Sequence, residues 1–204
     1  WLTTTRPPAR RPVGGTEFFA VPYLTAAVYW VTGVTFWAGR VVPLIFALVG
    51  VVYFFRLVRY LYDDAIGLAA AFLLTVSPFL LFTGRVQMPE SFAFAMAFAA
   101  VFYYARWLAE PGQRYYARAL VFTGLMLLAK PHFAVLALPM GYMTFRANKW
   151  QAIRDYRLYL FGLLAALPAI LYQAYSHSLI AASGISFAQP FLGDHGLLLR
   201  PGFW

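Results

Sequence analysis

A short polar stretch between two long apolar runs holds residue types that could do chemistry. Residues 83–91 include Arg85 and Glu90, while the flanking residues 65–82 and 92–105 carry no charge. This pattern predicts a turn between two membrane-crossing helices. An arginine and a carboxylate at a membrane face are costly unless they pair or meet a charged ligand, which makes them candidate binding residues. The alternative is that Glu90 caps the next helix and Arg85 extends to the lipid headgroups.

The composition is typical of an integral membrane protein. Of the 204 residues, 62% are hydrophobic and 11% charged, and the mean hydropathy is +0.67, whereas soluble domains carry roughly 25% charged residues. The net charge of +9 lies in short clusters between apolar runs, which indicates cytoplasmic loops facing anionic lipid and disfavours nucleic acid as a partner. The absence of cysteine excludes a disulfide framework and a thiolate zinc site.

The order of apolar and polar segments predicts an all-α fold, a multi-pass transmembrane helix bundle with interfacial helices. Residues 1–33 are expected to form an outer-face loop, rich in proline and arginine, followed by an aromatic interfacial helix. Residues 34–175 are expected to form the transmembrane domain, with about six crossings. Within it we expect crossings at residues 37–55, 65–82, 92–105 and 158–175. Residues 176–204 are expected to form an outer-face loop or interfacial segment.

Residues 119–145 form one apolar run, interrupted by Lys130, Pro131 and His132. A single helix here would be long and kinked and would bury a lysine, whereas two short helices would place these residues at a shared apex. Three basic clusters decide between the two: Arg56 and Arg59; Arg106, Arg114 and Arg118; Arg146, Lys149, Arg154 and Arg157. Only a helical pair places all three clusters on one side, as the positive-inside rule requires. The apex then shares the opposite face with Glu17 and the polar stretch.

The residues collected on that outer face suit group transfer from a lipid phosphate. Arginine binds phosphate through a bidentate fork and lysine as a point charge, which fits Arg85 and Lys130. A nearby carboxylate could accept the proton of an attacking hydroxyl, while the cations stabilise the charge of a leaving phosphate. Each residue also has a simpler explanation: Lys130 could extend to the headgroups, and Glu17 could merely begin an interfacial helix. The aromatic residues that follow Glu17 are more typical of a lipid belt than of a sugar-stacking platform. They are Phe18, Phe19, Tyr23, Tyr29 and Trp30.

Other kinds of chemistry find less support. His132 has no metal-like spacing from the other two histidines, which favours a hydrogen-bonded interfacial histidine. No cofactor is predicted with certainty, although a divalent metal ion stays open. The sequence has no phosphate-binding glycine loop, metalloprotease motif or serine elbow, so chemistry driven by soluble nucleotides has no support. The tail adds three further polar residues to the outer face: Asp194, His195 and Arg200.

Four short motifs in order resemble a known family. They are Gly-Thr-Glu-Phe-Phe-Ala-Val-Pro-Tyr-Leu at 15–24, Trp-Ala-Gly-Arg-Val-Val-Pro at 37–43, Ser-Pro at 77–78 with Arg-Val-Gln-Met-Pro-Glu at 85–90, and Leu-Ala-Lys-Pro-His at 128–132. Together they resemble the multi-pass glycosyltransferases of the GT-C fold, especially the bacterial branch that contains the lipid A aminoarabinose transferase and is related to the protein O-mannosyltransferases. The likeness covers about residues 15–175.

The resemblance implies an inverting transfer of a sugar from a polyprenyl-phosphate donor to a hydroxyl of a lipid, glycan or protein at the outer side of the plasma membrane. By position, Lys130 would contact the donor phosphate, and Arg85 and Glu90 would line or support the cavity. His132 is the fourth predicted substrate-binding residue, and Glu17 is an auxiliary catalytic candidate. The principal aspartate and the first transmembrane helix are expected upstream of Trp1, so we expect the chain by itself to be inactive.

Two features of the sequence leave questions open. Phe18 and Ala20 depart from the family's Glu-Lys-Pro version, which leaves the donor identity and any metal dependence undetermined. The alternative function is a transporter or flippase in which Arg85, Glu90 and Lys130 line a substrate pathway. Transporters often have broken helices in matching halves, but here the only clear break, at Pro131, has no counterpart.

Overall fold

The computed structural model describes residues 18–148 and 154–183. Contacts divide the chain into two units: the larger is Glu17–Ile170, and the described residues of the other, 171–183, continue the last helix. Every regular element in the described ranges is helical, which confirms the predicted all-α fold. The elements are α1 Ala20–Thr32, α2 Ala38–Leu61, α3 Asp64–Thr75, α4 Pro78–Thr83, α5 Glu90–Ala109, α6 Gln113–Ala129, the 3₁₀ helix η1 Pro131–Leu136, α7 Ala137–Asn148 and α8 Tyr156–Ser183.

Local chemistry explains where the first helices begin and end. α1 ends at Gly33, whose φ of 76° favours glycine and whose N–H donates to the Tyr29 carbonyl at 2.9 Å. α3 begins behind Asp63, which accepts a hydrogen bond from the Ile66 N–H at 2.8 Å. The apolar run 65–82 is not one helix, because Pro78 lacks an N–H and begins a new helix, α4, behind a Ser77 cap.

The helical pair predicted around Lys130 is confirmed. α6 ends at Ala129, and after Lys130 the chain forms η1 and then α7. The residue before a proline is disfavoured in helical conformation, and Lys130 is indeed extended, with φ −150° and ψ 101°. Pro131 therefore converts one apolar run into two helices whose apex carries Lys130.

Three helices are longer than predicted, among them α5, which spans Glu90–Ala109 instead of residues 92–105. α2 continues beyond residue 55 to Leu61, so Arg56 and Arg59 lie on its last turns instead of in a loop. α8 continues beyond residue 175 to Ser183. Apolar stretches mark the part of a helix that meets lipid, but helices extend past it wherever no proline or glycine ends them. The remainder of the predicted tail lies outside the described residues.

Three of the described helices are long and apolar enough to cross a membrane: α2, α5 and residues Tyr156–Ser178 of α8. α6 and α7, which form the helical pair, are shorter at 17 and 12 residues. The predicted count of about six crossings, and the division into three domains, stay predictions. In the larger unit, α1 packs against α2 and so belongs with the bundle.

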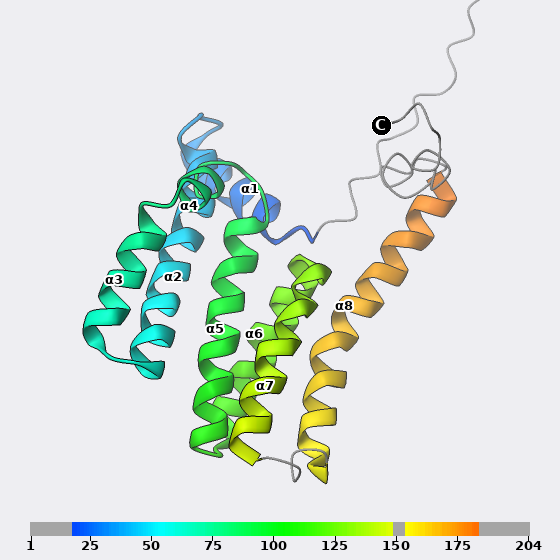
Figure 1. Cartoon of the computed structure of the whole chain (residues 1–204). Helices are drawn as coiled ribbons and strands as arrows, with labels where there is room; N and C mark the ends of the chain where they lie inside the picture. The colour runs from blue at the N-terminus through cyan, green and yellow to red at the C-terminus, as the bar shows by residue number, and fades with distance from the viewer. Residues whose placement is uncertain (1–17, 149–153, 184–204) are drawn as a thin grey trace, which may run out of the picture. The chain divides into compact units, whose positions relative to one another are not determined.

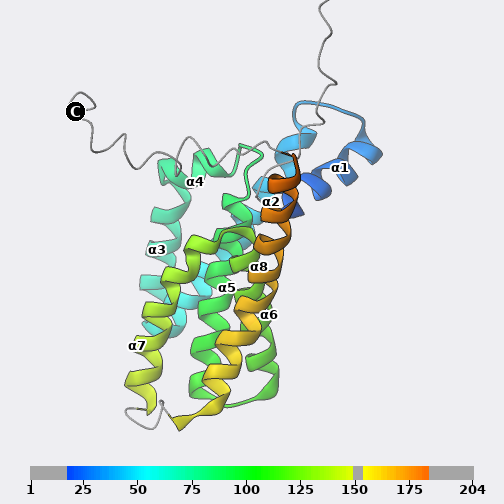
Figure 2. The same cartoon turned by 90° about the vertical axis from the view of Figure 1, so that its right-hand side faces the viewer.

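α5 lies at the centre of the larger unit, between α2 on one side and α6 on the other (Figures 1 and 2). Its buried surface is rich in alanine, which lets helix backbones approach closely in a membrane. The buried alanines include Ala93, Ala95, Ala97, Ala99 and Ala100. Figure 1 shows the α2–α3 turn, the α5–α6 turn and the facing ends of α7 and α8 at the same end of these helices. The described residues of all three basic clusters fall at that end.

Candidate functional site

The two ends of the α5–α6 hairpin meet in an ion pair. Glu90 is the first residue of α5, and Lys130 directly follows the last residue of α6. The Lys130 Nζ lies 3.0 Å from Glu90 Oε1, and the two side chains are only 16% and 28% exposed. The structure thus brings together two of the residues that the sequence singled out, although 40 positions separate them.

Backbone conformation and helix dipoles explain this placement. The Lys130 N–H still donates to the Met126 carbonyl at 3.0 Å, so Lys130 closes α6 while its extended backbone turns the chain out of the helix. A carboxylate is favoured at a helix N-terminus and a cation at a C-terminus. Because α5 and α6 run antiparallel, these two favourable positions lie side by side at one end of the hairpin.

Two buried polar atoms beside the pair have no hydrogen-bond partner among the residues that the structure describes. They are Glu90 Oε2 and the hydroxyl of Ser91, a residue that is only 1% exposed. The N-cap of α5 is Pro89, and no side chain caps this helix. Glu90 stands in the first turn of α5, where the alternative prediction placed it, and it also forms the ion pair with Lys130. A buried carboxylate oxygen without a donor is costly, which makes it suitable for accepting a hydrogen bond from a ligand.

The other predicted site residues are more exposed or fall outside the described ranges. Arg85 is exposed in the loop between α4 and α5, five residues before Glu90, and no ion pair or hydrogen bond of its guanidinium occurs within the described chain. His132 is exposed on η1, with its ring 5.2 Å from that of Phe133. Glu17 lies outside the described residues, as do the tail residues Asp194, His195 and Arg200.

Phe18, the first described residue, packs against the hydrophobic core beside the ion pair. Its ring centroid lies 6.5 Å from that of Phe92, which follows Glu90 by two positions. The sequence comparison with the Glu-Lys-Pro version of the family placed a lysine at this position. Here the position is apolar and contributes to packing, so it adds no cation beside Lys130.

Sequence reasoning missed Gln87, which lies between Arg85 and Glu90. Its amide nitrogen donates to the Tyr29 hydroxyl and to the Gly39 carbonyl, each at 3.1 Å. Tyr29 was interpreted as part of a lipid belt, yet it is half-buried and its hydroxyl is engaged. The sequence did contain a signal for one of these contacts. Pro43 has no N–H, so the carbonyl of Gly39, four residues earlier, lacks its usual helical donor and can accept from a side chain.

The described residues offer no group of three histidine, aspartate or glutamate side chains that could hold a metal ion. The described carboxylate at the predicted phosphate site, that of Glu90, is paired with Lys130. This donor set does not fit a divalent cation, so we derive no step through one.

An apolar cavity of about 540 Å³ lies between α5, α6, η1, α7 and α8, within the larger unit. Its wall includes Met126 and Leu127 on the last turn of α6 and Met140 on α7. The Met126 carbonyl is the one that accepts the Lys130 N–H. Although Lys130 and Glu90 do not line the cavity, it therefore begins about one helical turn from them.

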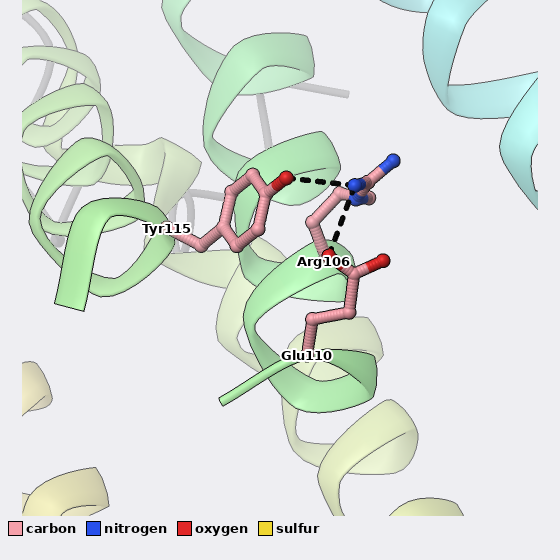
Figure 3. A network of polar contacts seen from close by, with 3 residues as sticks. All are labelled: Arg106, Glu110 and Tyr115. Carbon is pink, nitrogen blue, oxygen red and sulfur yellow. Dashed lines mark hydrogen bonds and ion pairs between the residues drawn. The ribbon is translucent and has the colours of Figure 1, made fainter. Parts of the chain in front are cut away.

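A polar network closes the hairpin at its other, basic end (Figure 3). Arg106 Nη2 donates to Glu110 Oε2 at 3.1 Å and to the Tyr115 hydroxyl at 2.7 Å. The Arg106 guanidinium also lies 5.5 Å from the Tyr60 ring centroid, a cation–π contact with α2. These contacts connect α2, α5 and α6. Because Arg106 lies 16 residues after Glu90 and a helix rises 1.5 Å per residue, they brace the hairpin about 24 Å from the Glu90–Lys130 pair.

A family model described as dolichyl-phosphate-mannose-protein mannosyltransferase matches residues 16–174. The chain belongs to this family. Membership confirms the resemblance inferred from the four motifs, and it assigns the chain to the membrane glycosyltransferases that use a sugar linked to polyprenyl phosphate. The matched range of the mannosyltransferase family contains Glu17, Arg85, Gln87, Glu90, Lys130 and His132. Searches of curated proteins and of solved structures find no significant match.

Proposed function

We propose that this chain supplies the donor-binding part of an inverting glycosyltransferase at the outer face of the plasma membrane, which it crosses several times. The sugar comes from a polyprenyl-phosphate donor, and the acceptor is a hydroxyl of a lipid, glycan or protein. The observation that carries the proposal is the Lys130–Glu90 pair, in which one buried carboxylate oxygen has no donor from residues 18–148 or 154–183. Family membership supports the donor class, and the pair gives the donor a place to bind.

In the proposed reaction, the acceptor oxygen attacks the anomeric carbon as the bond from that carbon to the phosphate oxygen breaks. The phosphate leaves with the electron pair, and Lys130, assisted by Arg85, stabilises its growing negative charge. The proton of the acceptor hydroxyl passes to a carboxylate at the reacting centre, a step in which Glu17 assists. A single displacement of this kind inverts the anomeric configuration. Glu90 Oε2 accepts a hydrogen bond from a sugar or acceptor hydroxyl, while His132 lines the entrance.

The apolar cavity suits the isoprenoid chain of the donor. It lies about one turn of α6 from Lys130, and its walls are almost entirely apolar. A phosphate at Lys130 would place the first isoprene units at the mouth of this cavity, where burying their surface contributes roughly 25 cal/mol per Å². The headgroup and the tail would then be held by different parts of α6.

The functional test uses the intact protein in proteoliposomes with polyprenyl-phosphate-linked sugars as donors. We expect transfer from such a donor, with the anomeric configuration of the product opposite to that of the donor. Transfer from a soluble nucleotide sugar instead, or retention of configuration, would contradict the mechanism. Movement of the lipid-linked sugar across the bilayer with no bond formed would favour the transporter alternative.

The orientation of the bundle gives a separate prediction. The chain contains no cysteine, so single cysteines can be introduced as probes. In whole cells, a membrane-impermeant thiol reagent should label Met88→Cys in the α4–α5 loop, whereas Gly112→Cys at the basic end should react only after permeabilisation. The basic clusters favour this orientation by the positive-inside rule. Labelling of residue 112 in unbroken cells, with residue 88 protected, would refute the outer-face placement.

A further inference from the structure

We propose that Gln87 is a positioning residue that ties the Arg85–Glu90 loop to α1 and α2 and thereby places Arg85 for the donor phosphate. The part of this inference that concerns the donor rests on the proposed function. The tether itself rests on geometry alone. It involves Gln87, Tyr29 near the end of α1, and Gly39 in the first turn of α2.

The two hydrogen bonds fix how the Gln87 amide is oriented. A backbone carbonyl can only accept, so the amide nitrogen must face Gly39, which it approaches to 3.1 Å. The second N–H of the same nitrogen is directed at the Tyr29 hydroxyl, also at 3.1 Å. One amide thus uses both of its donors to connect the loop with two helices that are distant from it in sequence.

α2 is built to receive this amide. In a regular helix the Gly39 carbonyl would accept from the N–H of residue 43, but Pro43 has none. The carbonyl is therefore available to a side chain. The absence of a Cβ at Gly39 matters as well, because a Cβ there would overlap both Gln87 Nε2 and the Tyr29 hydroxyl. Gly39 therefore gives the Gln87 amide room to approach. Pro43 leaves the Gly39 carbonyl available to accept a hydrogen bond from that amide.

The tether matters for the site because Arg85 has no anchor of its own in the described chain. Its side chain is exposed, and it stands two residues before Gln87 in a loop without regular structure. Positioning a charged group before the ligand arrives lowers the cost of binding. A loop released from α1 and α2 would hold Arg85 less firmly, which weakens donor binding more than it slows the chemical step.

The first experiment measures the loop directly in the intact protein. A cysteine at Val86, which is half-buried, reports loop opening through its rate of reaction with a thiol reagent. Gln87→Glu keeps the size of the side chain but presents a carboxylate, which can only accept, to the Gly39 carbonyl. We expect the labelling rate to rise at least about fivefold in Gln87→Glu and in Gly39→Ala, as expected for loss of a hydrogen bond. Tyr29→Phe, which leaves the bond to Gly39, should produce a smaller rise.

A double variant separates the tether from a general loss of packing. The double variant is made in a Tyr29→Phe background, because a methyl group at residue 39 has room only when both the Gln87 amide and the Tyr29 hydroxyl are absent. In that background, adding Gly39→Ala to Gln87→Ala should not raise the labelling rate further. The midpoint of thermal unfolding of each of these variants should stay within a few degrees of that of the parent protein. The tether would be overturned by an unchanged labelling rate in Gln87→Glu, or by additive increases of that rate in the double variant. Either result would hold regardless of the rates of sugar transfer.

The second experiment measures transfer by the same variants. We expect the KM for the polyprenyl-phosphate donor to rise about fivefold in Gln87→Glu, with turnover at saturating donor within about twofold of the parent. A faster-labelling loop with an unchanged KM would overturn the positioning of Arg85 for the donor, while leaving the role of Lys130 untouched. Absence of transfer by the parent protein, with labelling as expected, would instead refute the proposed function and the part of the inference that depends on it.

Discussion

Replacing Lys130 by alanine in the intact protein is expected to lower turnover at saturating donor by more than about tenfold. In the proposed reaction the phosphate gains negative charge as the bond to the sugar breaks, and Lys130 is the cation held at the end of α6. Its side chain is mostly buried, so it acts in surroundings where water screens its charge only weakly. The measurement is the initial rate of sugar transfer in proteoliposomes, as a function of donor concentration.

Two variants make the Lys130 result specific. Lys130→Arg keeps the charge but spreads it over a planar group, so we expect it to retain more activity than the alanine variant. Arg114→Ala removes a single exposed cation from the basic end of α6 and should leave turnover within about twofold of the parent. If Lys130→Ala transfers sugar at the parent rate, the lysine has no role with the leaving phosphate.

Loss of Lys130 also leaves Glu90 without its ion-pair partner, which could disturb folding. Removing one member of a buried pair is more damaging than replacing both by neutral groups of similar shape. The double variant Lys130→Met with Glu90→Gln therefore serves as the folding control. We expect it to unfold within a few degrees of the parent and still to transfer slowly, which assigns the loss to chemistry instead of stability.

Sequence patterns predicted the helices better than their ends. Hydrophobic runs and the basic clusters were enough to predict the all-α class and the break at Pro131, because proline and charge act locally. The continuation of α2 through Arg56 and Arg59 was missed, since charged residues at the end of a membrane helix look like a loop in a hydropathy pattern. Ser77 and Pro78 form a pattern that indicates the start of a helix, so the division of residues 65–82 into α3 and α4 was predictable although it was missed.

The sequence predicted which residues belong to the candidate site, but it predicted only part of how they are arranged in space. The motifs singled out Glu90 and Lys130, yet their direct contact depends on two helices running antiparallel in a register that the sequence does not state. Gln87 was missed for a similar reason, because its partners lie 58 and 48 positions away. Contacts of this kind become visible only when the helices are placed in space. The roles of Glu17 and His132 stay predictions.

The second large effect is expected at Glu90. Glu90→Gln should lower turnover at saturating donor about tenfold, without raising the KM for the donor. The reason is the buried Oε2 atom, which has no donor among the described residues. A hydrogen bond from a ligand hydroxyl to a carboxylate stabilises by about 1.5–3 kcal/mol, more than a bond to a neutral amide, and 1.4 kcal/mol corresponds to tenfold in rate. The KM should not rise, because Lys130 keeps its positive charge for the donor phosphate and no longer shares it with the Glu90 carboxylate.

This expectation separates two roles for Glu90 that the geometry alone allows. If the carboxylate only holds Lys130 in place, the amide oxygen of glutamine accepts from the same ammonium group and turnover is preserved. If it binds a hydroxyl in the transition state, glutamine keeps the shape but loses the charge, and turnover falls while donor affinity does not. Rates measured with Glu90→Gln over a range of donor concentrations therefore decide the point. If Glu90→Gln keeps the turnover of the parent, the role of Glu90 is limited to holding Lys130, and only the lysine acts on the donor directly.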